Sequence, residues 1–178
     1  DVSFDPAAVR AAAEALAAAE QPLLFVGGGV VLSDTAEEIR ELLRLTGMPS
    51  VVTLMGIGGI AAETEGFTGM AGMHGSYASN MAIQECDLLL AVGTRFSDRV
   101  TGNTAAFAPK ARIVHFDIDP AELNKNVRAD LPVLGDLRGT LPAFVAAVRA
   151  LGGDLTTRFR PWLGEGLSME RAHPLTWK

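Results

Sequence analysis

Charged side chains gather directly after one apolar segment of the sequence. The run LLLAV, residues 88–92, ends at Gly93, and Arg95, Asp98 and Arg99 follow within the stretch AVGTRFSDRVTG. Two planar guanidinium groups just beyond a buried strand are suited to binding a pyrophosphate, and Asp98 is placed to orient one of them. The alternative is an exposed salt-bridge cluster, which contributes little to stability. We favour the anion site.

A glycine triplet follows an earlier apolar run. Residues 22–26, PLLFV, end at Gly27, Gly28 and Gly29, where the missing side chains let a phosphate approach backbone N–H groups. The dinucleotide fingerprint G-x-G-x-x-G would need glycine at Leu32, so the sequence does not match it. A tight turn between a strand and a helix is an equally good interpretation of the triplet.

A second strand exit carries apolar and imidazole side chains. The residues are Thr53, Leu54 and Met55, followed further along a glycine- and methionine-rich passage by Gly72, Met73 and His74. Methionine side chains offer a flexible, polarizable surface to a flat ring system, and a neighbouring histidine could donate a hydrogen bond to it. A single histidine in a loop is more often simply solvated, so the alternative for His74 stays open.

Carboxylates follow the apolar run IVHF. Asp117 and Asp119 stand there, and a carboxylate at a strand end can accept hydrogen bonds from both hydroxyls of a ribose. Asp119 precedes Pro120 and is expected to cap a short helix, which leaves Asp117 as the better ribose ligand. At a last exit, Asp136 is also expected to be a helix cap, with the backbone beside Gly135 bordering an adenine.

Strands and helices alternate along the chain. Apolar runs without period-2 alternation predict strands near residues 22–26, 50–55, 87–93, 111–119 and 131–136. Helices are expected over residues 6–19, 34–45, 76–86 and 136–151, the second opened by an Asp34–Glu37 capping box and stopped by Gly47. This order predicts an α/β fold, a doubly wound, mostly parallel sheet of five to six strands with helices on both faces. Its ligands would bind beyond the carboxyl ends of the strands.

Composition sets further bounds. The 178 residues are 48% hydrophobic and carry a net charge of −6, which suits one globular domain and disfavours nucleic acid as a partner. No apolar run reaches the roughly 20 residues that span a bilayer, and no signal peptide is recognisable. A single cysteine fits a reducing cytoplasm, and no metal-ligand spacing, P-loop or nucleophile elbow is present. Residues 1–152 are expected to form the domain, and residues 153–178, which lack periodicity, a linker or interface arm.

With these residues assembled, the chain resembles the central domain of thiamine-diphosphate-dependent enzymes, specifically of the acetolactate (acetohydroxyacid) synthase catalytic subunits. The similar blocks, in family order, are GGGV, TLMGIGGI, GMAGMHGSYASNMAI, LLLAVGTRFSDRVTG, IVHFDIDPAELNKNV and LPVLGD. They cover about residues 5–150, and the HPLTW tail resembles a linker toward a third domain. Two departures are Ser97, where the family often has Asp, and GIAAETEGF, which lacks the family's proline and histidine.

The resemblance implies that this domain binds FAD, which takes no net redox part in the carboligation of two pyruvates, or of pyruvate with 2-oxobutyrate. It places the following residues at the cofactor: Gly27, Gly28, Gly29, Thr53, Leu54, Met55, Gly72, Met73, His74, Gly93, Thr94, Arg95, Arg99, Val100, Asp117, Ile118, Gly135 and Asp136. No catalytic residue and no metal ligand is implied within this chain. Flanking domains would bind thiamine diphosphate and magnesium, so the chain alone is expected to be inactive.

Two other functions remain open at this point. Relatives in the superfamily use the same domain to hold ADP or no cofactor at all. The domain could also serve assembly, as a structural unit that docks on partner chains or on a second copy of itself.

Overall fold

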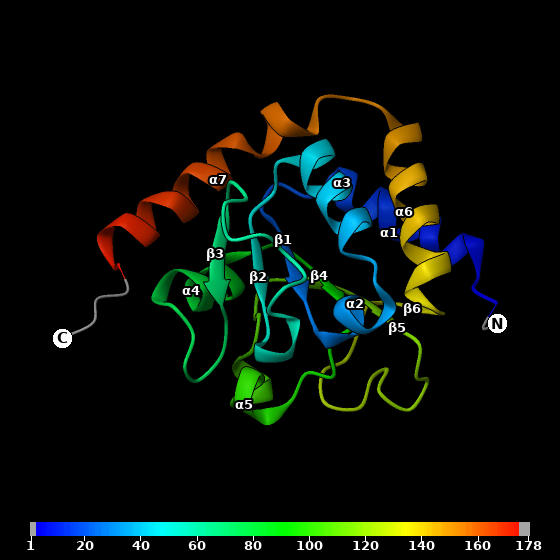
Figure 1. The fold of residues 1–178 in the computed structure, drawn as a ribbon, viewed down its shortest axis with the longest axis horizontal. Coiled ribbons are helices and arrows are strands. Elements are labelled where there is room, and N and C mark those ends of the chain that lie inside the picture. Colours follow the sequence, from blue (N-terminus) through cyan, green and yellow to red (C-terminus); the bar gives the residue numbers. More distant parts are fainter. Residues whose placement is uncertain (1–2, 175–178) are drawn as a thin grey trace.

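The computed structural model describes residues 3–174, in which every strand belongs to one six-stranded parallel sheet with helices on both faces (Figure 1). The strands are β1 (Pro22–Val26), β2 (Ser50–Val52), β3 (Phe67–Met70), β4 (Leu88–Val92), β5 (Arg112–Asp117) and β6 (Leu131–Leu134). Their order, β3-β2-β1-β4-β5-β6, is that of a doubly wound dinucleotide-binding fold. The predicted fold class is therefore confirmed.

Helices cover the sheet in two groups. They are α1 (Pro6–Ala18), α2 (Gly28–Ser33), α3 (Ala36–Thr46), α4 (Tyr77–Glu85), α5 (Asp98–Thr101), α6 (Leu137–Leu151) and α7 (Leu155–Ala172), with 3-10 turns η1 (Leu54–Gly56) and η2 (Thr104–Ala106). One core packs α1, α3 and α6 on the sheet, and the other packs α4 with the phenylalanines of the loop between β4 and β5. Strands β1 and β4 are buried along their whole length, as their unbroken apolar runs predict.

Three local expectations are wrong. The glycine- and methionine-rich passage, where no strand was expected, contains β3, a short edge strand whose glycine and threonine are not typical of a strand. Asp34 does not open α3: it ends the short helix α2 in a left-handed conformation, φ 57°, and Thr35 is the N-cap of α3. Asp119 caps a turn through the N–H of Ala121, at 2.8 Å, but no helix follows. Asp136 caps α6, as predicted.

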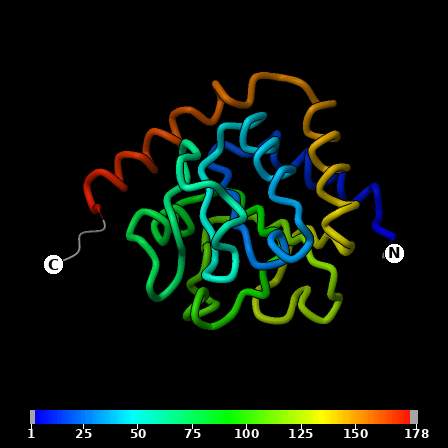
Figure 2. The backbone as a smooth tube through the Cα atoms, viewed as in Figure 1, coloured from blue at the N-terminus to red at the C-terminus, as the bar shows by residue number. Residues whose placement is uncertain are grey.

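The segment expected to be an aperiodic arm is largely the helix α7. It crosses the amino-terminal edge of the sheet, from beside α6 to beside α4 (Figure 2). Phe159 and Trp162 are buried, and the Trp162 indole N–H donates to the Pro22 carbonyl at 2.9 Å. Residues of α7 up to Gly166 are therefore part of the buried core. The expected domain boundary at residue 152 stays a prediction. Within the HPLTW tail, residues 175–177 lie outside the described residues.

The turns after β1 and β4 meet where the strand order reverses. The N–H of Gly27 donates to Val92 O at 2.9 Å, and that of Gly29 donates to Gly93 O at 3.0 Å. A Cβ atom on Gly27 would lie 2.2 Å from Gly93 O. The two turns thus pack backbone against backbone. The glycine triplet is a tight turn, as one interpretation predicts. It also has no side chains on its outer side, as the phosphate-binding interpretation requires.

We expect Gly93→Ala to lower the free energy of unfolding by about 2–5 kcal/mol, because a left-handed backbone strain adds to a steric clash. Gly93 has φ +60°, and its Cβ would lie 2.7 Å from Gly29 Cα. Gly47→Ala is the matched control, since Gly47 has φ +64° but its Cβ would lie an ordinary 3.5 Å from Thr156 Cα. The control should lose only about 1–2 kcal/mol. Equal losses in denaturant melts would contradict the proposed clash.

We also expect Trp162→Phe to destabilise the fold by about 1–3 kcal/mol, because it removes volume and leaves the buried Pro22 carbonyl without its donor. Glu165→Ala, at an exposed position on the same helix, should change stability by no more than about 0.5 kcal/mol. Thermal and urea unfolding measure both. If the two variants unfold alike, α7 is not fastened through Trp162.

Candidate functional site

The parallel sheet brings the carboxyl ends of its strands to one edge, on the side of α2 and α5 (Figure 1). Each strand end carries residues that the sequence analysis singled out. Gly27 follows β1, Thr53 follows β2, Gly93 follows β4, Asp117 ends β5, and Gly135 follows β6. Residues 72–74, expected at the exit of the second strand, instead follow β3, which the sequence did not reveal.

Apolar side chains lie open at the exits of β2 and β3. Leu54, Met55 and Met73 are 66%, 70% and 74% exposed, although all three are hydrophobic. Thr53, in contrast, is buried and its hydroxyl accepts the N–H of Gly56 at 3.1 Å, which makes it a cap of η1. Of these four residues, Thr53 is therefore structural, and Leu54, Met55 and Met73 are apolar side chains available to a ligand.

The loop after β3 is fastened to α5. Met73 N–H donates to Arg99 O at 3.0 Å, and a Cβ on Gly72 would lie 2.9 Å from the same oxygen. Asn80 of α4 bonds both the N–H and the carbonyl of Gly72, at 2.9 and 3.0 Å. Sequence reasoning missed Asn80, whose amide can donate and accept at once. The GMHG and RFSDRV motifs are thus neighbours, and His74 is exposed beside them.

The two arginines of the β4 exit are exposed and form no ion pair within residues 3–174. Asp98 does not orient either guanidinium: its Oδ1 accepts the backbone N–H of Arg99 at 2.9 Å. The predicted salt-bridge alternative is likewise not what the structure contains. Arg95 and Arg99 therefore keep their positive charge unneutralised by neighbouring carboxylates, as a site for an anion requires.

Three arginines that line a cavity on another part of the surface are, in contrast, paired with carboxylates. A cavity of about 340 Å³ between α3 and α7 is lined by Arg40, Arg44 and Arg160, among others. Each has a carboxylate partner: Arg40 with Glu37, Arg44 with Glu41 at 2.8 Å, and Arg160 with Glu65 at 3.3 Å. This cavity contains none of the strand-exit residues, and its arginines are already neutralised.

Phe96 anchors the loop that carries Arg95. It is buried at φ +50°, a conformation that bulky side chains rarely adopt, and its ring packs against Phe25 with centroids 6.1 Å apart. Asn126 adds hydrogen bonds to the carbonyls of Arg95 and Phe96, at 3.3 and 3.1 Å. Neither Phe96 nor Asn126 was identified from the sequence, which contains no signal for a left-handed phenylalanine. Their contacts hold Arg95 outward at the strand end.

Asp117 is a buried carboxylate at the end of β5. Its Oδ1 accepts the N–H of Asp119 at 2.9 Å, and its Oδ2 lies 3.6 Å from His115 Nε2. Burial raises the pKa of Asp117, but the nearby His115 imidazole and the backbone hydrogen bond from Asp119 outweigh this effect, so the pKa lies below its ordinary value. The ionised form is an acceptor suited to hydroxyl groups. Asp119 is engaged with its own turn and not with a helix, and Ile118 is half exposed.

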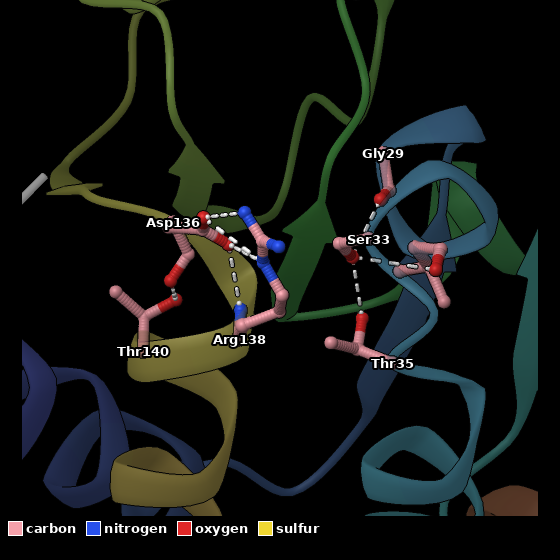
Figure 3. A network of polar contacts seen from close by, with 7 residues as sticks. Gly29, Ser33, Thr35, Asp136, Arg138 and Thr140 are labelled. Carbon is pink, nitrogen blue, oxygen red and sulfur yellow. Dashed lines mark hydrogen bonds and ion pairs between the residues drawn. The ribbon is translucent and has the colours of Figure 1, made fainter. Parts of the chain in front are cut away.

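Asp136 is the N-cap of α6, as predicted, and is already occupied (Figure 3). It accepts the Arg138 backbone N–H at 2.9 Å and the Arg138 guanidinium at 2.6 Å, an ion pair that lowers the pKa of Asp136 to about 2. Across from this pair, Ser33 bonds Gly29 O and Thr35 at the end of α2 (Figure 3). At this exit the Gly135 backbone remains, and its N–H donates to Asp117 O at 3.0 Å.

Two other kinds of feature, a metal-binding cluster and a membrane-spanning helix, are absent from the described part of the chain. Residues 3–174 contain no group of three or more histidine, cysteine or acidic residues placed to hold a metal ion. None of their helices has the length and apolar character needed to cross a bilayer.

Comparison with known proteins identifies the family. Residues 9–144 match the family described as thiamine pyrophosphate enzyme, central domain. The chain is 43% identical over 169 residues to an acetolactate synthase of Mycobacterium bovis, covering 95% of this chain and 27% of that protein. It is 50% identical over 143 residues to the acetolactate synthase isozyme 2 large subunit of Escherichia coli, covering 80% and 26%.

An archaeal relative gives the same result. The probable acetolactate synthase large subunit of Methanocaldococcus jannaschii is 47% identical over 146 residues, which are 82% of this chain and 25% of that protein. The chain thus spans about a quarter of the length of these relatives. Since the family match covers most of the sheet and its exits, the chain belongs to the thiamine pyrophosphate enzyme central-domain family.

Proposed function

We propose that the chain binds FAD across the carboxyl edge of its sheet, as the central domain of an acetolactate synthase. The observation that carries this proposal is the pair Arg95 and Arg99, which follow β4 at the carboxyl edge of the sheet and have no carboxylate partner among residues 3–174. A diphosphate supplies the charge that two free guanidinium groups bind well. In the whole enzyme the domain would serve the condensation of two pyruvates, or of pyruvate with 2-oxobutyrate.

The edge fits the parts of such a cofactor. The exposed Leu54, Met55 and Met73 offer an apolar surface to a flat flavin ring, which supplies a large face to cover. Asp117, ionised and buried, would accept hydrogen bonds from the hydroxyls of the adenosine ribose. The remaining residues of the predicted set would border the cofactor through their backbone. Thiamine diphosphate and magnesium belong, on this proposal, to flanking domains of the parent enzyme.

ADP binding is the second candidate. Asp117, Gly135 and the two arginines would serve adenosine diphosphate as well as they would serve the corresponding half of FAD. The exposed methionines and Leu54 favour FAD, because ADP would leave them uncovered. A purely structural domain is less well supported, since it gives Arg95 and Arg99 no role.

We expect FAD to bind more tightly than FMN, because Asp117 and the Gly135 backbone would contact only the adenosine half. Calorimetry on the full chain with FAD, FMN and ADP measures the three affinities. Absorbance of the purified protein in the flavin bands, and the mass of any ligand released on denaturation, identify what it carries. Equal affinities for FAD and FMN would remove the adenosine end from the site, and tight ADP binding without flavin binding would favour the second candidate.

We expect Arg95→Ala and Arg99→Ala each to weaken FAD binding by about tenfold to a hundredfold. A charge-assisted hydrogen bond contributes roughly 1.5–3 kcal/mol, and each 1.4 kcal/mol is a factor of about ten. Stability should change little, because neither guanidinium has an ion pair to lose within residues 3–174.

Arg40→Ala is the matched control, an exposed arginine of α3 paired with Glu37. It should leave FAD affinity unchanged. If both strand-exit variants bind FAD as the wild type does, with the fold intact, the two arginines lie outside the site.

A further inference from the structure

His115 is a buried polar side chain that the proposed function leaves unused. It lies in β5 with no exposed surface, among the apolar side chains that include Phe96, whose ring centroid is 4.8 Å away. Its Nε2 is 2.8 Å from the Thr94 carbonyl and 3.6 Å from Asp117 Oδ2. Its Nδ1 is buried and has no hydrogen-bond partner among the described residues.

The contacts of Nε2 join two strand exits. A carbonyl oxygen only accepts, so Nε2 carries the hydrogen and donates to Thr94 O. The same nitrogen lies 3.6 Å from Asp117 Oδ2, which is longer than a hydrogen bond but close enough for an electrostatic contact with the carboxylate. Through one ring atom, the backbone that leads to Arg95 and the carboxylate that ends β5 are held in a fixed relation.

The nitrogens of this ring do not serve the packing of the core. An unpartnered Nδ1 among apolar side chains is unfavourable, and a phenylalanine would keep the edge-on contact with Phe96 without it. Their favourable contribution lies at Nε2, which acts on the two strand exits and not on the core.

We propose that His115 is a positioning residue that sets the Asp117 carboxylate and the Thr94 backbone in the arrangement that binds an adenosine diphosphate group. This rests on the proposed function and deepens it. Asp117 meets the ribose hydroxyls and Arg95 the diphosphate, while His115 touches neither and fixes their spacing. The ligand class is therefore any molecule with both a ribose and a diphosphate, which FAD and ADP share and FMN lacks.

The test is His115→Phe, which keeps the aromatic packing and removes both ring nitrogens. ADP affinity, measured by calorimetry on the full chain, should fall about five- to tenfold, as expected for one lost hydrogen bond. FMN affinity should stay unchanged, and the melting temperature should change little, because the loss of the Nε2 donor to the Thr94 carbonyl and the removal of the unpaired Nδ1 have opposite effects on stability. Unchanged ADP affinity, or equal losses for ADP and FMN together with a lower melting temperature, would overturn the proposal.

A double-mutant cycle connects the effect to Asp117. In an Asp117→Asn background, His115→Phe should cause a smaller loss of ADP affinity than it causes in the wild type, because one of the two groups that it positions is absent. An equal loss in both backgrounds would show that His115 does not act on Asp117, and the proposal would fail.

A measurement without ligand separates this proposal from the proposed function. The contact with His115 Nε2, at 3.6 Å, favours the ionised carboxylate, so His115→Phe should raise the pKa of Asp117 in a ¹³C NMR titration. Wild-type protein that binds neither ADP nor FAD would sink the proposed function, and with it the ligand named here. An unmoved Asp117 pKa would overturn the positioning role, whatever the protein binds.

Thr46→Val is the control for general loss of a buried hydrogen bond. The Thr46 hydroxyl donates to Leu42 O at 2.8 Å in the last turn of α3, away from the strand exits. This variant should lower stability while leaving both ADP affinity and the Asp117 pKa unchanged. A change in either would mean that the effects of His115→Phe are not specific to the site.

Discussion

The direct contact between the backbone of the Gly27–Gly29 turn and that of Gly93 is the constraint on which the site depends. A Cβ at Gly27 or Gly93 would come within 2.2–2.7 Å of backbone atoms across the contact, so neither turn tolerates a side chain there. This closeness holds the exits of β1 and β4 together at the point where the strand order reverses. It also keeps side chains out of the middle of the edge and leaves the chemistry to residues on its rim. A doubly wound sheet offers its ligand site at this reversal.

The rim residues divide according to whether the protein itself already satisfies their side chains. Thr53, Asp119 and Asp136 cap turns or helices, and Asp98, the first residue of α5, accepts the N–H of Arg99, so the oxygens of all four side chains are already engaged by nearby backbone N–H groups. Leu54, Met55, Met73, Arg95 and Arg99 have no such role, for they are exposed apolar groups or cations without an ion pair in residues 3–174. Sequence reasoning expected Asp119 and Asp136 to be caps, yet it kept Thr53 and Asp136 in the cofactor set, because only the structure shows that their side-chain oxygens are already engaged.

The central strands of the fold could be predicted from the sequence, whereas an edge strand and the last helix could not. The runs at residues 22–26 and 88–92 are apolar throughout because both faces of a central strand are covered, so the sequence reveals them directly. The edge strand β3 is short, half-buried and contains glycine, and nothing in FTGM distinguishes it from a loop. Pro161 and two glycines hide α7, whose helical form depends on Phe159 and Trp162 meeting a core that only the folded chain contains. The sequence pattern therefore predicts elements such as β1 and β4, whose residues carry their own signal, and it does not predict β3 and α7, which depend on tertiary packing.

The candidate site follows the same division. The residues that end β1, β2, β4, β5 and β6 could be found because each follows a recognisable apolar run. The buried residues that hold them in place could not be found in this way. Phe96 holds a left-handed backbone because its ring is buried against Phe25, Phe107 and His115, which come from distant parts of the sequence. Strain of this kind persists only where the surroundings over-determine it. The exposed Arg95 therefore owes its position to the buried residue beside it. What this edge can bind therefore depends on the buried rings that surround Phe96 as much as on the side chains at its surface.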